Sequence, residues 1–359
     1  MKKVHKYYDY KFFNYSFNEL VIFPDESQNG LSRYQQLLPV QNFGECSLGE
    51  GHTPLTKATS LESKYGYSTI YIKHEELNPT GSFKDRESCL AIAIAKEKKL
   101  LEVTIASSGN AALSLAAYAR KAKIRCVCFV PENTSQQKKS LIELFGARLH
   151  EVKGNYEYTY RYVADHFNLK NNLTSGICSE RTEANKTIAF EIWEEIGVPD
   201  IVIVPCGNGG NIAGIWKGFS DLKKMGKTSK IPKMIAVQVK GAAPLAKALA
   251  VKKEFYILNN DIESIAEGIL AEESFCSPKA IKAIQNSGGV VIEVTDQEIK
   301  MALTTVIHLE SLMLEPTSAA AFAALAKLKS LNVSIDSKIV VINTGSGMKM
   351  LSEIQQNMI

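Results

Sequence analysis

Short apolar runs alternate along the chain with stretches in which apolar residues recur every three or four positions. The runs are typical of buried strands, and the stretches at 110–122, 180–197 and 316–330 are typical of amphipathic helices. Continuously apolar strands that alternate with helices predict parallel sheets covered on both faces, and hence an α/β fold. The predicted strands are 69–75, 103–108, 125–130, 201–206, 234–239, 289–294 and 338–344.

Polar turns that contain glycine follow three of these strands, at 107–110, 207–211 and 344–347. Parallel sheets bind ligands beyond the carboxyl ends of their strands, so the three turns are expected to line one shared crevice. No internal repeat or long linker is present, which indicates lobes interleaved in the sequence. We expect a large lobe from 1–79 and 181–359, and a small mobile lobe from 80–180.

Composition is that of an ordinary globular protein of 359 residues, 45% hydrophobic and 22% charged. The net charge of +4 is too small to indicate a nucleic acid partner, and no apolar run is long enough to predict a membrane span. The seven cysteines form no C-x-x-C pair and the six histidines show no metal-ligand spacing, so no disulfide framework or metal site is expected. Reduced thiols and an N-terminus unlike a secretory signal indicate a cytoplasmic protein.

The turn at 207–211, "GNGGN", is the strongest candidate for a phosphate site. Glycines permit positive φ and close approach, and backbone N–H groups at a helix start bind phosphate. The spacing matches neither the dinucleotide fingerprint nor a Walker A loop. The alternative is a tight turn without a ligand. The hydroxyl and amide groups at 107–110 are also explained by helix capping.

Lys84 follows a Thr-Gly-Ser turn and stands next to Phe83 in "NPTGSFKDRE", residues 78–87. Lysines form Schiff bases with aldehydes when burial or cationic neighbours lower their pKa. Pyridoxal 5′-phosphate is an aldehyde with a phosphate and a ring nitrogen that needs a polar partner. A reactive lysine, a phosphate loop and two polar turns therefore predict this cofactor.

The motifs resemble, in identity and order, those of the fold-type II pyridoxal-phosphate enzymes, and within them threonine synthase. The resemblance covers roughly residues 48–350 and implies a tryptophan synthase β-like fold, with two three-layer αβα lobes and a cleft between them. It is carried by "LGEGHTPL" (48–55), "HEELNPTGSFKDR" (74–86), "ASSGNAALSLAAYARKA" (106–122), "ANKTIAFEI" (184–192), "GNGGNIAG" (207–214), "EPTSAA" (315–320) and "TGSGMK" (344–349).

The resemblance implies a role for each matching residue at the cofactor. Lys84 would form the Schiff base and later serve as acid and base. Asn110 would hydrogen-bond the 3′-oxygen of the ring, and Thr344 would face the ring nitrogen. The residues that would bind the phosphate are Gly207, Asn208, Gly209, Gly210 and Asn211.

A second set of implied residues belongs to the substrate. Ser107, Ser108 and Gly109 would bind its carboxylate at a helix start. Threonine synthase also needs a site for the phosphate of O-phospho-L-homoserine, for which the resemblance implies Lys139 and Arg181. The alternatives are a solvated Lys139, and an Arg181 that caps or pairs with Glu180 or Glu183.

The chain also departs from the family pattern. Glu87 replaces the glycine of the family pattern, and Met350 replaces an aspartate. The pair Ser175-Gly176 replaces Asn-Ser, and the pair Ala184-Asn185 replaces Gly-Gln. We expect these departures to leave the residues that hold the cofactor untouched. Several should instead lie where the substrate's distal group binds.

The expected function is that of a lyase which converts O-phospho-L-homoserine and water to L-threonine and phosphate by γ-elimination and β-addition of water. One alternative is a β-replacement or β-elimination enzyme of the same fold, similar to cysteate or cystathionine synthases or to threonine or serine dehydratases. Another is a non-catalytic cofactor-binding protein, against which the intact motifs argue. The family suggests a homodimer with an amino acid substrate, and the aromatic N-terminal arm either packs on the body or a partner subunit, or is frayed.

Overall fold

The computed structural model describes residues 5–16, 23–168, 170–259 and 263–358, and the chain divides into two compact units. Unit 1 comprises Met1–His52 and Asn78–Thr187. Unit 2 comprises Thr53–Leu77 and Ile188–Ile359. Each unit is thus assembled from two separate stretches of the chain.

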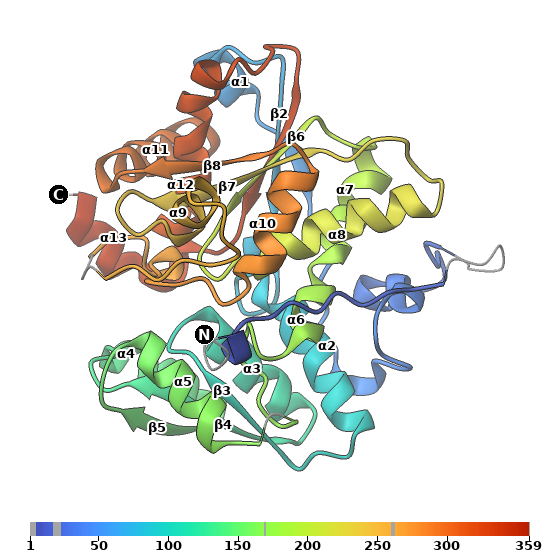
Figure 1. Cartoon of the computed structure of the whole chain (residues 1–359), viewed down its shortest axis with the longest axis vertical. Helices are drawn as coiled ribbons and strands as arrows, with labels where there is room; N and C mark the ends of the chain where they lie inside the picture. Colours follow the sequence, from blue (N-terminus) through green and yellow to red (C-terminus); the bar gives the residue numbers. More distant parts are fainter. Residues whose placement is uncertain (1–4, 17–22, 169, 260–262, 359) are drawn as a thin grey trace. The chain divides into compact units, whose positions relative to one another are not determined.

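Unit 1 contains a parallel sheet with the strand order β3-β4-β5, shown in green in Figure 1. The strands are β3 (Glu102–Ala106), β4 (Arg125–Pro131) and β5 (Arg148–Val152). The alternation of β4 directs Val127 and Phe129 into an apolar cluster, while the Sγ atoms of Cys126 and Cys128 lie 3.8 Å apart. The helices of this unit are α2 (Lys84–Glu97), α3 (Asn110–Lys121), α4 (Gln136–Leu144), α5 (Tyr156–His166) and α6 (Ser179–Ala184).

The N-terminal stretch, with the short 3₁₀ helices η1 (His5–Tyr7), η2 (Gly30–Leu37) and η3 (Gly44–Cys46), belongs to unit 1. Residues 1–79 were expected from the sequence to belong to the larger lobe, but hydrogen bonds tie the described part of 1–52 to unit 1. Side chains of unit 1 bond to Tyr7 and Asp9 at one end of the stretch and to Glu50 at the other. These bonds join Tyr160 Oη to the Tyr7 carbonyl (3.0 Å), Ser179 Oγ to Asp9 (2.7 Å) and Tyr118 Oη to Glu50 (2.9 Å).

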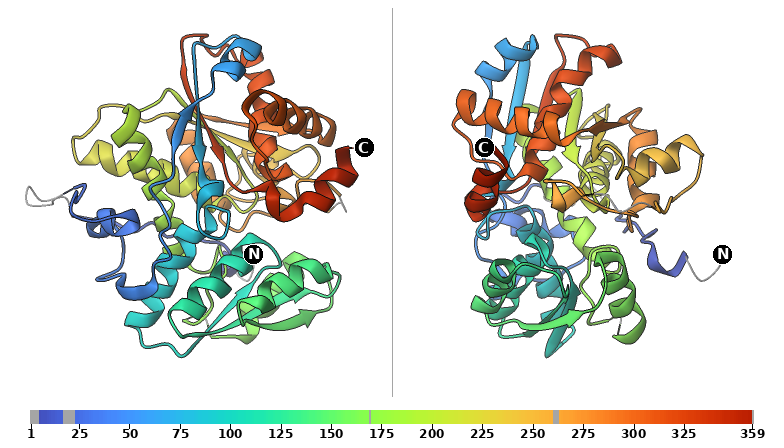
Figure 2. Two further views of the ribbon diagram at one scale, coloured as in Figure 1. Left: turned by 180° about the vertical axis from the view of Figure 1, so that it is seen from behind. Right: turned by 90° about the vertical axis from the view of Figure 1, so that its left-hand side faces the viewer.

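Unit 2 contains a six-stranded sheet with the order β1-β2-β9-β6-β7-β8. All neighbours are parallel except β1 and β2. Strand β2, from the first quarter of the sequence, lies beside β9, from the end of it, blue next to red in Figures 1 and 2. The strands are β1 (Leu55–Lys57), β2 (Thr69–His74), β6 (Ile201–Pro205), β7 (Lys233–Val239), β8 (Val290–Val294) and β9 (Lys338–Asn343).

Helix α11 of unit 2 begins at a cap that the sequence supplies. At α11 the side chain of Thr295 accepts from the backbone N–H of Glu298, and Glu298 accepts from the backbone of Thr295, which is a capping box. The α-helices are α1 (Thr59–Tyr65), α7 (Lys186–Ile196), α8 (Gly210–Lys224), α9 (Pro244–Ala250), α10 (Ser277–Asn286), α11 (Asp296–Glu310), α12 (Pro316–Ala323) and α13 (Leu351–Met358). The 3₁₀ helices are η4 (Glu75–Leu77), η5 (Glu267–Ile269), η6 (Ala324–Leu331) and η7 (Gly347–Met350).

The core of unit 2 lies between its sheet and the apolar faces of α11 and α12. Helix α12 is mostly apolar and almost entirely buried, which is typical of a helix enclosed by other elements. This packing fixes the carboxyl ends of β6 and β9, from which the polar turns at 207–211 and 344–347 follow.

Three further findings bear on function. Within the described residues, no helix has the length and apolarity needed to cross a membrane. All seven cysteines are free and buried. No group of three or more His, Cys, Asp or Glu side chains arranged to hold a metal ion occurs in the described part of the chain.

Candidate active site

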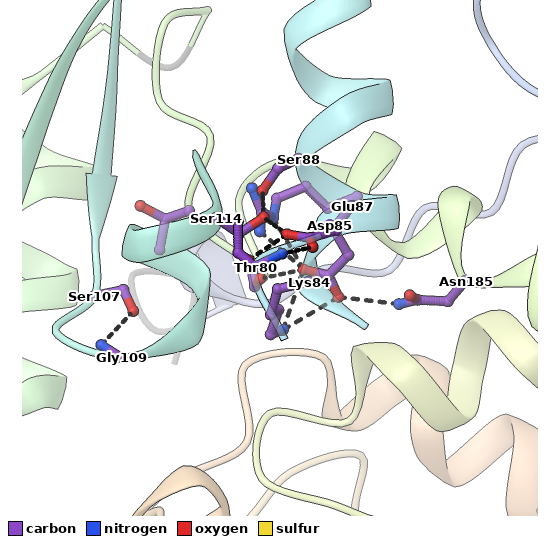
Figure 3. A network of polar contacts seen from close by, with 12 residues as sticks. Thr80, Lys84, Asp85, Glu87, Ser88, Ser107, Gly109, Ser114 and Asn185 are labelled. Carbon is purple, nitrogen blue, oxygen red and sulfur yellow. Dashed lines mark hydrogen bonds and ion pairs between the residues drawn. The ribbon is translucent and has the colours of Figure 1, made fainter. Parts of the chain in front are cut away.

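Lys84 is the first residue of α2 and follows a turn that its neighbours hold in place. Gly81 has φ +80°, which a side chain would strain, and its N–H donates to the carbonyl of Asn78 at 2.7 Å. The backbone N–H and the hydroxyl of Thr80 both donate to the carboxylate of Asp85, at 2.6 and 2.5 Å. The sequence "PTGSFKD" therefore forms a closed turn that presents Lys84 (Figure 3).

Asp85 anchors this turn from the buried side of α2. Ser114 donates to the Asp85 carboxylate at 2.6 Å and connects it to Ser88 at 2.8 Å. Burial raises the pKa of Asp85, and the hydrogen bonds from Ser114 and Thr80 only partly oppose this rise. The anchor is thus a hydrogen-bonded carboxyl group that joins α2, α3 and the turn (Figure 3).

The Lys84 side chain is 20% exposed, and its nitrogen lies between a carboxylate and an aromatic ring. Nζ is 3.1 and 3.2 Å from the two oxygens of Glu87, and 4.4 Å from the centre of the Phe83 ring. This surrounding differs from that of a solvated surface lysine. It holds the amine at a defined position at the start of α2.

Glu87 is 1% exposed and shares its carboxylate among four side chains. Besides Lys84, the donors are Ser175 Oγ at 3.2 Å, Arg181 Nε at 3.0 Å and Asn185 Nδ2 at 3.0 Å. Burial raises the pKa of Glu87, but the charges of Lys84 and Arg181 and the hydrogen bond from Asn185 outweigh it and leave that pKa lowered. Glu87 is therefore an ionised carboxylate inside unit 1.

This cluster corrects one expectation from the sequence. The departures from the family pattern were expected to leave the cofactor-holding residues untouched, yet Glu87 contacts Lys84 directly. Two further departures, Ser175 and Asn185, bind the same carboxylate. The glutamate that pairs with Arg181 is Glu87, and not a sequence neighbour, because α2 and α6 pack together.

The turn at Ser107–Asn110 joins β3 to α3 in unit 1. Its residues are half-buried or exposed, and the N–H of Gly109 donates to Ser107 Oγ at 3.3 Å (Figure 3). A Cβ added at Gly109 would meet nothing within 4 Å, so space lies in front of the α3 N-terminus. An anionic group is favoured at such a helix start.

Lys139, on α4 of the same unit, is engaged and not solvated: its side chain is 10% exposed. Its nitrogen lies 2.8 Å from Glu151 Oε1 and 3.1 Å from the carbonyl of Glu132. The contacts observed for Lys139 and Arg181 are with different carboxylates, in different parts of unit 1.

The glycine turn of unit 2 connects β6 to α8. Gly209 has φ +90°, and a Cβ there would lie 2.7 Å from the Cβ of Ala280. A Cβ at Gly207 would lie 3.0 Å from the carbonyl oxygen of Gly268. The carbonyl of Gly207 accepts from Ser274 Oγ at 2.6 Å. Gly209 therefore requires glycine, Gly207 leaves little room for a side chain, and the loop is held from the side of α10.

The buried side chain of Asn211 marks the start of α8 as a place for a polar ligand. It is 7% exposed, and within the described part of the chain neither of its polar side-chain atoms has a hydrogen-bond partner. Unpaired buried amides are costly, and a phosphate in front of a helix N-terminus would supply an acceptor. The turn thus fits the phosphate of pyridoxal phosphate.

Thr344 lies at the end of β9 in unit 2 and is fixed by Ser318 of α12. Ser318 Oγ is 3.0 Å from the Thr344 hydroxyl and accepts from the N–H groups of Thr344 and Gly345, at 3.1 and 2.9 Å. A Cβ on Gly345 would lie 2.5 Å from the Glu315 carboxylate, so a side chain there would displace Glu315. The hydroxyl of Thr344 is thus held in place, and it can donate a hydrogen bond to a ligand or accept one from it.

Sequence reasoning did not assign roles to several supporting residues. Ser318 and Glu315 lie in the motif "EPTSAA", which was recognised, although no contact was inferred from it. Ser274 carried no signal. Glu87 was noticed as a departure, and its position three residues after Lys84 on one helix was the available signal for the contact.

The chain matches the family model described as "Pyridoxal-phosphate dependent enzyme" over residues 46–345. It is 38% identical over 326 residues to threonine synthase of Methanocaldococcus jannaschii, covering 89% of this chain and 80% of that relative. Threonine synthase of Halalkalibacterium halodurans is 34% identical, with 89% of each chain covered.

Solved structures show the same fold. Threonine deaminase isoform 2 from Solanum lycopersicum has a TM-score of 0.70 at 22% identity, covering 85% of this chain and 86% of that one. Serine racemase from Dictyostelium discoideum has a TM-score of 0.67 at 25% identity, covering 82% and 92%.

These likenesses confirm the α/β class, the fold type and the cofactor predicted from the sequence. The family model spans most of the chain, and the matches to relatives of more than 30% identity cover most of those relatives. The protein therefore belongs to the pyridoxal-phosphate-dependent enzymes and, within them, to the threonine synthase-like lyases.

Proposed function

We propose that the chain converts O-phospho-L-homoserine and water to L-threonine and phosphate. The observation that supports this most directly is the similarity to threonine synthases along nearly the whole chain. The held amine of Lys84, the glycine turn and the Thr344 hydroxyl provide the chemical groups that the reaction needs.

The proposed cofactor residues are divided between the units. Lys84 and Asn110 belong to unit 1, whereas the phosphate-binding set 207–211 and Thr344 belong to unit 2. When bound, pyridoxal phosphate supplies an electron sink for the carbanion at Cα of the substrate. Thr344 is a neutral partner for the ring nitrogen, so it does not enforce a charged ring as a carboxylate would.

Residues of unit 1 act on the substrate in this proposal. Ser107, Ser108 and the N–H of Gly109 bind its carboxylate at the start of α3. Lys84 then takes the proton from Cα and moves protons at Cα and Cβ. Phosphate leaves from Cγ, Cγ gains a proton and becomes the methyl group, water adds its oxygen at Cβ to give the hydroxyl of threonine, and a proton returns to Cα.

Departure of phosphate is assisted by fixed cations, for which Lys139 and Arg181 are proposed. Nη2 of Arg181 lies 3.0 Å from the Glu87 carboxylate, whereas Nη1 is buried and has no hydrogen-bond acceptor within the described residues. An arginine held through Nε and Nη2 by Glu87 retains the Nη1 donor for an anion.

A second candidate is favoured by the charge of Glu87. Its carboxylate offsets one cation near Lys84, which favours a substrate whose distal group carries less charge than a phosphate ester. A β-replacement or β-elimination reaction on a serine- or threonine-like substrate would meet this condition. We further propose a cytoplasmic homodimer, as the family suggests.

The test is to add O-phospho-L-homoserine to the purified holoenzyme and to measure phosphate and threonine. Release of both in equal amounts supports the proposal. Lys84→Ala should abolish it, whereas Lys121→Ala, at an exposed lysine near the end of α3, should not. Keto acid formation from serine or threonine, without phosphate release from O-phospho-L-homoserine, would instead support the second candidate.

A further inference from the structure

We propose that Glu87 is a positioning residue for Lys84, which fixes the side-chain nitrogen of Lys84 and retains a proton on it to higher pH. The inference rests on the proposed covalent link between Lys84 and the cofactor. It deepens that site by naming the residue that sets the protonation of the linking nitrogen.

The first support is the geometry of the pair. Lys84 and Glu87 are three residues apart at the start of α2, so one face of the helix carries both. Both carboxylate oxygens lie within 3.2 Å of Nζ. An anion at this distance favours the protonated form of a nitrogen base.

The second support is that the carboxylate itself is immobilised. Asn185 binds one oxygen of Glu87, and Ser175 and Arg181 bind the other. Glu87 is 1% exposed, so its charge is screened less by solvent and salt than that of a surface pair. These three contacts, none of which involves Lys84, hold the anion beside it.

The third support is the charge balance. The charged groups seen to face Glu87 are Lys84 on its own helix and Arg181 on α6, and the lowered pKa of Glu87 agrees with two cations around one anion. Removal of Glu87 would leave Lys84 next to an uncompensated Arg181, which disfavours a proton on Lys84. Removal of Arg181 would have the opposite effect.

A purely structural role predicts something different. If Glu87 only joined α2 to α6, its loss would lower stability and leave the titration of the Lys84 nitrogen unchanged. A measurement of the protonation of Lys84 therefore distinguishes the two roles, whereas a measurement of activity does not.

The experiment follows the absorbance of the holoenzyme, which reports protonation of the linking nitrogen, as a function of pH. In Glu87→Gln we expect the midpoint to fall by about one pH unit or more. Glu183→Gln is the matched control, because Glu183, on α6, is likewise a buried glutamate, but its ion pair is with Lys186, at 2.8 Å. An unchanged midpoint in Glu87→Gln, or an equal fall in the control, would overturn the inference.

A second variant decides the matter if Glu87→Gln fails to fold or to bind the cofactor. Arg181→Gln removes the opposing cation and should raise the midpoint, and a constant or lower midpoint would overturn the inference. The absorbance does not depend on the substrate. A shifted midpoint without turnover of O-phospho-L-homoserine would contradict only the proposed reaction, and turnover with an unshifted midpoint in the variants would contradict only the role of Glu87.

Discussion

Lys84, Glu87 and Arg181 form a buried cluster in which two cations share one anion. Removing one partner of such a cluster is costly because the remaining charges stay buried without compensation. The lowered pKa of Glu87 has the same cause, because the two cations favour the ionised carboxylate. The charge balance of the cluster can therefore be tested without substrate or cofactor.

We predict that Glu87 contributes to stability above its unfolded pKa, about 4.3, and that this contribution is lost as the pH falls through the lower folded value. A buried pair loses about 3–5 kcal/mol when one partner is removed, so Glu87→Gln should cost about this much at pH 7. The measurement is urea unfolding of the apo-protein from pH 7 down to pH 3. The difference in free energy of unfolding between wild type and Glu87→Gln should become smaller below about pH 4. A difference that stays constant would show that Glu87 is not ionised in the folded protein.

Lys84 could be predicted as the reactive lysine from the sequence alone, because it follows a glycine-containing turn and stands next to an aromatic residue. The partners of Glu87 could not, since Arg181 and Asn185 lie 94 and 98 residues away along the chain. Only the packing of α2 against α6 brings them together. A local pattern is enough to propose a reactive residue, whereas the charges around that residue depend on tertiary contacts.

At the scale of elements, α8 depends on glycine at two places for different reasons. Gly209 precedes the helix with φ +90° and faces the Cβ of Ala280. Gly226 follows its end with φ +72°, and a Cβ there would meet nothing within 4 Å. The two positions share the positive φ and differ in the surroundings, so they form a matched pair.

We predict that Gly226→Ala costs about 1–2 kcal/mol, from the left-handed backbone alone. Gly209→Ala should cost more, because the contact with Ala280 forces the turn to shift, and it should also weaken cofactor binding. Urea unfolding and titration of the apo-protein with pyridoxal phosphate measure the two effects. Equal losses of cofactor affinity in both variants would contradict a specific role of the 207–211 turn.

The strands of this fold were largely predictable, and all seven predicted runs are strands in the structure. The two that escaped prediction carry a weak signal. Strand β1 is only three residues long, and β5, "RLHEV", is a mostly polar edge strand. The helix expected at 180–197 is broken at Asn185, whose side chain binds Glu87; this interruption has no periodic signature.

At the scale of the whole molecule, the chain builds each unit from two stretches that are distant in sequence. The order of the family motifs made the fold predictable, because each motif marks a strand end or a helix start. The allocation of the first 52 residues was not predictable in the same way. It depends on hydrogen bonds such as that between Tyr118 and Glu50, which no sequence pattern marks.

The division of the proposed cofactor residues between the units gives the last prediction. A ligand that binds only the folded chain stabilises it by about 2.7 kcal/mol at 100 times its Kd, which raises a melting midpoint by about 2–4 °C. If one cofactor molecule uses residues of both units, Lys84→Ala in unit 1 and Thr344→Val in unit 2 should each reduce this gain. Melting curves of apo- and holo-protein measure it for each variant.

The outcome distinguishes two arrangements of the cofactor residues. A reduced gain in both variants, with one cofactor bound per chain, supports a single site that draws on both halves of the sequence. A gain lost in Lys84→Ala but unchanged in Thr344→Val would contradict the role of Thr344 at the ring nitrogen. Ser318 Oγ lies 3.0 Å from the Thr344 hydroxyl, so Ser318→Ala releases this hydroxyl. We therefore expect Ser318→Ala to change the cofactor-dependent gain in melting midpoint in the same way as Thr344→Val.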